Sequence, residues 1–264
     1  MKGKCGLCYQ EAELKDSHLI PKSLYKRIRS SSESNDIILF RSDEASAHYT
    51  SSQIKRHFLC GSCEHLFSVK GENRVNRECY DGKDSFEFRD RVLLKGQPLN
   101  IYKVTKAAEN FENWCEYFYF AVSIIWRASN WPDKNFPSQI VLGTSYEEDI
   151  REYLKNEAGI PDNIFLCIYV DSDNKPSSLI HFPVTAKKDG FHIHSFYIPG
   201  MKFSLFIGKK ARGKIPFEKD DSRCLAFLRE FKSHPDFSTL SNRVANNYNP
   251  KGRLADDLKK KKGN

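Results

Sequence analysis

The pattern of apolar and polar residues divides the chain of 264 residues into stretches of different character. Residues 110–131 are dense in apolar and aromatic side chains, which predicts a mostly buried helix. A shorter amphipathic helix is expected over residues 145–159. The largely apolar residues 163–173, NIFLCIYVDSD, predict a strand that ends in a turn.

Three further segments alternate apolar and polar residues and are separated by glycine or proline: 177–185, 190–199 and 202–208. This alternation is typical of antiparallel strands with one face more buried than the other. A last helix is expected around residues 224–234, CLAFLREFKSH. The predicted class of this half is therefore α+β with an antiparallel sheet.

Composition and charge indicate which cellular compartment and which binding partners to expect. No uninterrupted apolar run approaches the roughly 20 residues that a membrane-spanning helix needs, and the first residues lack the apolar stretch of a secretory signal. A cytoplasmic protein without a membrane partner is therefore expected. Lysine and arginine exceed acidic residues by eight, partly through the run over residues 251–262, and this charge favours polyanions, nucleic acid first. The alternative for this run is a disordered segment that only aids solubility.

Four of the eight cysteines form two Cys-x-x-Cys pairs: Cys5, Cys8, Cys60 and Cys63. Because a cytosolic chain keeps its thiols reduced, such pairs indicate a metal site, and four thiolates suit a tetrahedral structural zinc ion. Each pair has glycine after its first cysteine, and glycine suits a turn whose backbone leaves ordinary φ/ψ space. A redox-active pair is the alternative. The 51 residues between the pairs exceed the spacing of a compact zinc ribbon, so a structured insertion is expected there.

The pattern of apolar and polar residues and the positions of the cysteines together suggest that the chain has three parts. Residues 1–92 are expected to form a zinc-binding domain, residues 93–248 an α+β domain that recognises substrate or regulates access, and residues 249–264 a basic flexible tail. No motif indicates the oligomeric state or a protein partner.

Two segments beside the cysteine pairs carry candidate chemistry. They are LKDSHLIPKSLYK over residues 14–26 and CEHLFSVKGENRV over residues 63–75. The order of these features resembles that in the zinc-bound HNH nucleases of the treble-clef, ββα-metal group. The features are a cysteine pair, a polar residue before histidine, a hydrophobic-Ile-Pro run, and a second cysteine pair that opens a helix. The Ser-His-Leu-Ile-Pro and Cys-Glu motifs match a variant of this pattern in bacterial HNH-like proteins. The resemblance covers about residues 1–80.

The resemblance implies roles for three residues. His18, at the end of the first strand, would be the general base that activates water, and a neutral imidazole is suited to this at neutral pH. Glu64 would be a ligand of the catalytic divalent ion, Mg²⁺ or Mn²⁺. Ser17 stands where the family has an acidic residue or histidine, but Asp16 shares the strand face of His18 and could substitute as the second ligand.

Three further residues are candidate additions to this site: Glu72, His65 and Asn73. Glu72 lies eight residues beyond Glu64, which places it about 80° around a regular helix, so that only a kink near Gly71 would bring it in. Asn73 points away from Glu64 on such a helix. His57 and His65 flank the second cysteine pair, where they would touch phosphate or face solvent. His192 and His194 share one face of a predicted strand, where a half-exposed face is favoured over a second metal site.

The resemblance implies an HNH-like endonuclease that hydrolyses phosphodiester bonds of nucleic acid, most often DNA, in settings such as bacterial restriction or phage defence. The alternative is a non-catalytic zinc-stabilised module that binds nucleic acid or protein and has lost the catalytic ion. In a third hypothesis the C-terminal half carries the main function as a sensor or partner-binding domain. The sequence leaves the choice between DNA and RNA open.

Overall fold

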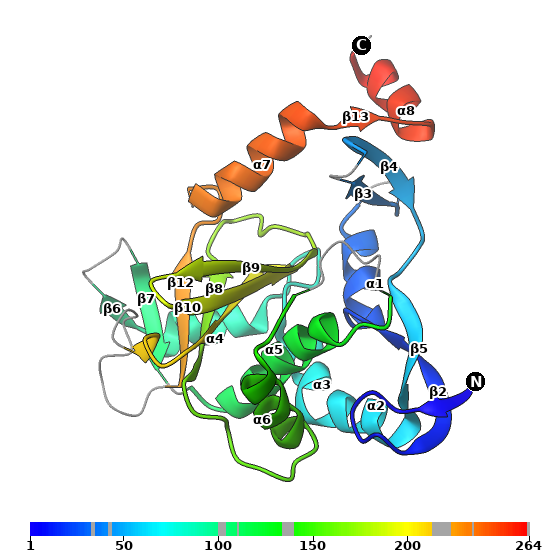
Figure 1. Ribbon diagram of the computed structural model, residues 1–264. Coiled ribbons are helices and arrows are strands. Elements are labelled where there is room, and N and C mark those ends of the chain that lie inside the picture. Colours follow the sequence, from blue (N-terminus) through cyan, green and yellow to red (C-terminus); the bar gives the residue numbers. More distant parts are fainter. Residues whose placement is uncertain are drawn as a thin grey trace.

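The computed structural model describes residues 1–32, 35–41, 44–99, 104–109, 111–133, 140–212, 223–233 and 235–262. This part of the chain mixes helices with one seven-stranded and two three-stranded sheets, which confirms the α+β class and the expected antiparallel pairing. Figure 1 shows the N-terminal strands and helix α2 on one side of the molecule and the large sheet on the other.

The N-terminal part builds a small sheet that leads directly into a helix. Its strands β1 (Lys2–Lys4), β2 (Glu11–His18) and β5 (Lys55–Cys60) pair antiparallel in the order β1-β2-β5. Helix α2 (Gly61–Phe67) starts at the end of β5. It continues through one π-helical segment, η1 (Ser68–Glu72), into α3 (Asn73–Glu78).

The insertion between β2 and β5 is structured, as the spacing of the cysteine pairs predicts. It contains helix α1 (Lys22–Ser30) and the hairpin of β3 (Ile37–Arg41) and β4 (Ser46–Thr50).

The C-terminal segment completes this insertion. Strand β13 (Asn249–Pro250) pairs parallel to β4, and helix α8 (Arg253–Lys262) packs on β4 through the buried Leu254. Arg253 pairs with Asp36 across the interface. Residues 249–262 of the segment expected to be a flexible tail thus form a strand and a helix that contact β4, despite the high charge of the segment.

The large sheet has the strand order β6-β7-β12-β8-β11-β10-β9. All of its pairs are antiparallel except β12 with β8. The strands are β6 (Gln97–Leu99), β7 (Val104–Glu109), β8 (Ile164–Asp171), β9 (His181–Lys188), β10 (Phe191–Ile198), β11 (Met201–Ile207) and β12 (Cys224–Arg229). The four predicted strands from residue 163 to residue 208 are confirmed as β8 to β11.

Strand β12 replaces the helix expected around residues 224–234. Its first five residues are all buried, and it lies between β7 and β8 inside the sheet. A strand covered on both faces has a continuous apolar run, and such a run cannot be told from a buried helix by periodicity alone.

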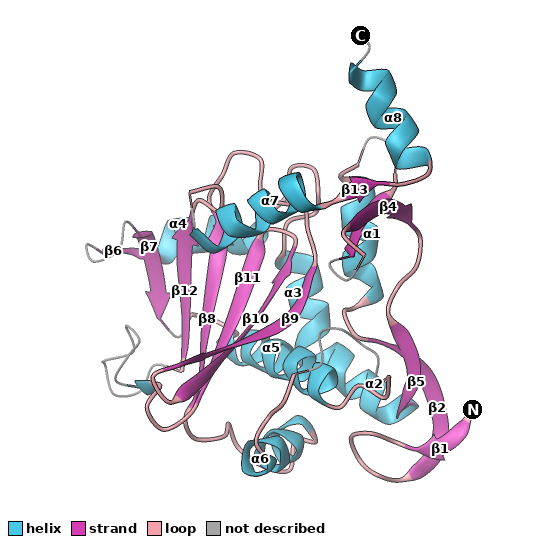
Figure 2. Cartoon of the chain, turned by 45° about the horizontal axis from the view of Figure 1, so that its top comes forward, coloured by secondary structure: helices cyan, strands magenta, loops and turns pink. Residues whose placement is uncertain are grey.

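Helix α5 (Trp114–Ser129) joins the two parts of the molecule. All twelve residues from Tyr117 to Ala128 are buried, as expected for a helix that is apolar on every side. Phe120 contacts the rings of Phe196 and Phe203 on one face of the large sheet, while other residues of α5 pack against η1 and α3 (Figure 2). One hydrophobic cluster therefore extends from Cys5 to Leu228.

The remaining helices lie around this framework. They are α4 (Glu87–Lys95), α6 (Thr144–Leu154), which confirms the predicted amphipathic helix, and α7 (Pro235–Asn247).

Gly71 allows η1 and α5 to approach each other closely. A Cβ atom at this position would lie 2.9 Å from the backbone nitrogen of Phe120 and 3.0 Å from the carbonyl oxygen of Glu116. Because both neighbours are backbone atoms of a buried helix, neither can rotate out of the way. A side chain here would push the two helices apart.

We expect Gly71→Ala to lower the free energy of unfolding by about 1–3 kcal/mol, although alanine is normally preferred over glycine in a helix. Urea denaturation followed by circular dichroism measures this change. The matched control is Gly159→Ala, since a Cβ atom there meets nothing within 4 Å, and it should stay within about 0.5 kcal/mol of the wild type. Equal stability of both variants would contradict the close contact.

Candidate functional site

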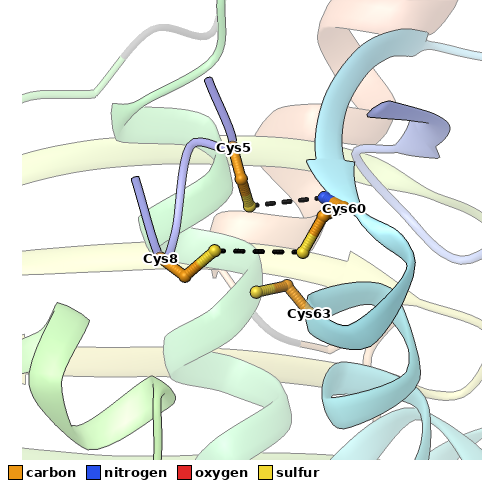
Figure 3. A group of neighbouring side chains, drawn as sticks. All are labelled: Cys5, Cys8, Cys60 and Cys63. Carbon is orange, nitrogen blue, oxygen red and sulfur yellow. Dashed lines mark hydrogen bonds between the residues drawn. The ribbon is translucent and has the colours of Figure 1, made fainter. Parts of the chain in front are cut away.

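The two cysteine pairs meet in one cluster (Figure 3). Cys5 and Cys8 lie in the turn between β1 and β2, Cys60 ends β5, and Cys63 lies in the first turn of α2. Their four sulfur atoms all lie within 4.8 Å of one another, as expected for a shared metal ion. Cys5, Cys60 and Cys63 are buried and Cys8 is partly exposed.

The chemistry of this cluster fits a structural metal ion such as zinc. All four donors are sulfur atoms, and four thiolates form a closed tetrahedral zinc site. The backbone N–H of Cys60 donates a hydrogen bond to Sγ of Cys5 at 3.3 Å. A hydrogen bond from Cys63 lowers the pKa of the Cys5 thiol to about 4, which favours the thiolate that binds metal. These residues would hold the ion and leave no position open for a reacting molecule.

The glycines of the two pairs do not adopt an unusual backbone conformation. Neither Gly6 nor Gly61 is among the described residues with positive φ, so the expectation from the sequence is wrong on this point. A Cβ atom at Gly6 would lie 2.1 Å from the ring of Phe58, which occupies that space. Directly after the first pair, Tyr9 takes the left-handed conformation, with a φ of 60°.

We expect the purified protein to contain one zinc ion per chain by elemental analysis. Cys63→Ser should lose this ion and lower the melting temperature by about 10 °C or more, because the binding free energy of a structural zinc contributes to folding. Cys115→Ser is the matched control, since Cys115 is exposed on α5 and outside the cluster. A Cys63→Ser variant with wild-type zinc content and melting temperature would exclude the site.

A cavity of about 390 Å³ opens beside the cluster. It lies where the end of β2, the start of α1, one side of α2 with η1, and helix α5 come together. Its lining residues are His18, Pro21, Lys22, Glu64, His65, Ser68, Glu72 and Arg127. Four of the residues predicted for the site therefore share one cavity: His18, Glu64, His65 and Glu72.

His18 ends strand β2 at the wall of this cavity. Its Nε2 atom lies 2.8 Å from Oε1 of Gln53, a hydrogen bond that orients the ring. In the Nε2–H tautomer of the ring, Nε2 donates to this amide oxygen and Nδ1 is left free to accept a proton. Gln53 lies in the loop before β5, and its sequence neighbours give no signal for this role.

Ser17, which departs from the family pattern, has a structural place. The residue is buried, and its Oγ accepts a hydrogen bond from the backbone N–H of Leu59 at 3.1 Å. This bond adds to the pairing of β2 with β5 behind His18. Ser17 does not line the cavity.

The π-helical segment η1 brings Glu72 to the same cavity as Glu64 and Ser68. Hydrogen bonds from residue i to i+5 widen the turn, so that residues eight apart come round to one side of the helix. The sequence predicts that only a kink near Gly71 would bring Glu72 to this side. A π-bulge does so in the structure, and π-bulges are frequent at functional sites. Oε1 of Glu64 is buried and has no hydrogen-bond partner among the described residues.

Asp16 and Asn73 lie outside the cavity lining. Asp16 is 44% exposed and forms an ion pair with Lys55, which lowers the pKa of its carboxyl group. Asn73 is exposed and its Oδ1 accepts a hydrogen bond from Ser68 at 3.1 Å. His57 is exposed and lies opposite Asp16 on β5. Within the described ranges, the four cysteines alone are placed closely enough to form a metal-binding group of three or more such side chains.

Arg127 of α5 is a residue of the cavity that sequence reasoning missed. Its side chain is 2% exposed, its Nη1 donates to the carbonyl oxygen of His18 at 3.1 Å, and its Nη2 pairs with the carboxylate of Glu72. One signal was present in the sequence. An arginine in the otherwise apolar segment over residues 117–128 needs a buried partner, because an unpaired charge there would be costly.

His192 and His194 show no metal-binding arrangement in the described part of the sheet. His194 is buried on β10 and its Nδ1 lies 2.8 Å from Oγ1 of Thr185. Burial lowers the pKa of His194 to about 4. The rings of the two histidines are 6.0 Å apart, and no third ligand joins them among the described residues.

Comparison with known proteins adds no family to this description, since no protein-family model, curated protein or solved structure matches the chain. Among the described helices, none combines the length and the apolar character that crossing a membrane would require.

Proposed function

We propose that this protein is a metal-dependent, HNH-like endonuclease that hydrolyses phosphodiester bonds of DNA in the cavity beside the four-cysteine cluster. One observation carries the proposal. The cavity collects His18 from the end of β2 with Glu64, His65 and Glu72 from the helix that follows the second cysteine pair. A role in bacterial restriction or phage defence would follow from the same resemblance.

His18 would act as the general base. The hydrogen bond from Nε2 to Gln53 fixes the tautomer and leaves Nδ1 to take a proton from water. The oxygen of that water would then attack the phosphorus atom, and the bond from phosphorus to the leaving oxygen would break. Gln53 thereby serves as the orienting partner that a catalytic histidine requires.

Glu64 and Glu72 are the residues that would hold a divalent ion in this cavity. The buried and unpartnered Oε1 of Glu64 fits such a role, and carboxylate oxygens suit Mg²⁺ or Mn²⁺. When bound, the ion stabilises the charge that develops on the phosphate and the leaving oxygen. Asp16, the ligand expected from the sequence, would first have to leave its ion pair with Lys55.

The rim of the cavity suits an anionic substrate. Lys22 and His65 are exposed where they line the cavity, and the chain as a whole carries a net charge of +8. Lysine contacts phosphate oxygens without reading sequence, so these residues would position a nucleic-acid backbone and would not select a base.

A non-catalytic zinc module that binds nucleic acid or protein is the second candidate. Two observations favour it. Asp16 forms an ion pair with Lys55, and among the described residues the four cysteines form the compact metal-binding group.

We expect the purified protein to cut plasmid DNA with Mg²⁺ or Mn²⁺, and His18→Ala and Glu64→Gln each to lower the rate by about a hundredfold or more. His192→Ala and Glu13→Gln are matched controls, because they remove a histidine and an exposed carboxylate outside the cavity, and they should cut like the wild type. Rates are measured from agarose gels.

Two outcomes would change the assignment. Cutting that persists at the wild-type rate in both cavity variants would refute the assigned residues. An absence of cutting with every divalent ion, with DNA binding retained in a gel-shift assay, would favour the non-catalytic module.

A further inference from the structure

We infer that Arg127 is a positioning residue that holds the two sides of the proposed active site together, so that catalysis depends on a helix outside the HNH-like segment. This inference rests on the proposed function of the cavity. Residues 1–80 carry the resemblance to HNH nucleases, whereas Arg127 belongs to helix α5.

Three contacts fix the guanidinium group of Arg127. One nitrogen donates to the backbone carbonyl of His18, a second pairs with the carboxylate of Glu72, and the guanidinium carbon lies 4.6 Å from the ring centroid of Phe67. The flat, rigid fork of arginine can serve two acceptors at once, which a lysine ammonium on a flexible stem does less well. The side chain is buried, so water does not compete for these contacts.

The two acceptors come from different elements, and both residues line the cavity. His18 is the last residue of β2, and Glu72 is the last residue of the π-helical segment η1. The carboxylate of Glu72 is only 15% exposed, so its charge needs the nearby cation. Arg127 therefore sets the place of the general base relative to Glu72 and compensates one of the two carboxylates.

The same contacts give α5 a functional role besides packing. Helix α5 crosses one face of the large sheet and reaches the cavity near its C-terminal end. A shift of this helix would move the guanidinium group, and with it His18 and Glu72. Small displacements of such groups cost much activity, because a misplacement of about 1 Å can lower a rate by about a hundredfold.

Arg127→Lys and Arg127→Met test the inference, with Arg91→Lys as the matched control. Arg91 also bonds a buried acid, Glu78, and lies 3.2 Å from the hydroxyl of Tyr117 on α5, but it does not line the cavity. The Arg91→Lys variant therefore shows how much activity is lost when the packing of α5 is weakened away from the cavity. The readouts are kcat and KM for cleavage of a DNA duplex with Mn²⁺, and the tautomer of the His18 ring from long-range ¹H–¹⁵N NMR at pH 8, assigned with His18→Ala.

We expect Arg127→Lys to lower kcat by about tenfold to a hundredfold with KM within about twofold, and the His18 ring to lose its single Nε2–H tautomer. Arg91→Lys should keep both properties. If Arg127→Met does not fold, Arg127→Lys decides alone.

Arg127→Lys with wild-type kcat and an unchanged His18 spectrum would overturn the inference, as would an equal loss in Arg91→Lys. If the wild type cuts no DNA, the proposed function fails separately. The His18 spectrum of the full-length protein then still decides whether Arg127 positions the ring.

Discussion

The four cysteine side chains bring together two points of the chain that are far apart in sequence, and a metal ion such as zinc bound by them would link these points. They connect the turn between β1 and β2 with the junction of β5 and α2, and they enclose an insertion of 51 residues. A tetrahedral thiolate site tolerates little change in the positions of its ligands. A metal ion bound there would fix the start of β2 relative to the first turn of α2, and these two elements carry His18 and Glu64 to the cavity.

A second constraint comes from the close packing of η1 on α5. Gly71 offers no side chain at the contact, and the π-helical segment places Gly71 against α5 while Glu72 faces the cavity. In a regular α-helix the two requirements would conflict, because Glu72 would lie about 80° around the helix from Glu64. Gly71 is the buried residue of η1, and it lies at the contact with α5.

The cysteine-bearing part and the large sheet share one hydrophobic core, and helix α5 within this core also lines the cavity. Arg127 brings a charge from α5 into contact with His18 and Glu72, and Arg91 and Tyr117 surround the buried carboxylate of Glu78 nearby. Such buried charges are stable only with their partners in place, so both networks couple the position of α5 to the N-terminal helices. The C-terminal segment also returns to the N-terminal part, where β13 and α8 complete the sheet of β3 and β4.

The sequence by itself determined the features that depend on local spacing. Two Cys-x-x-Cys pairs specify a four-sulfur cluster, alternation specifies β9, β10 and β11, and a run dense in apolar and aromatic residues specifies the buried helix α5. His18 and Glu64 could be selected in the same way, from motifs of a few residues.

Only the tertiary structure decided the features that depend on partners distant in sequence. The run over residues 224–229 became strand β12 because it lies between two strands of the sheet, and residues 249–262 form β13 and α8, which contact β4. Asp16 pairs with Lys55 of the neighbouring strand, whereas Glu72 reaches the cavity through a π-bulge that accompanies packing on α5. Gln53 bonds to His18 across 35 residues, and Arg127 bonds to His18 across 109 residues and to Glu72 across 55; such contacts leave no periodic pattern in the sequence.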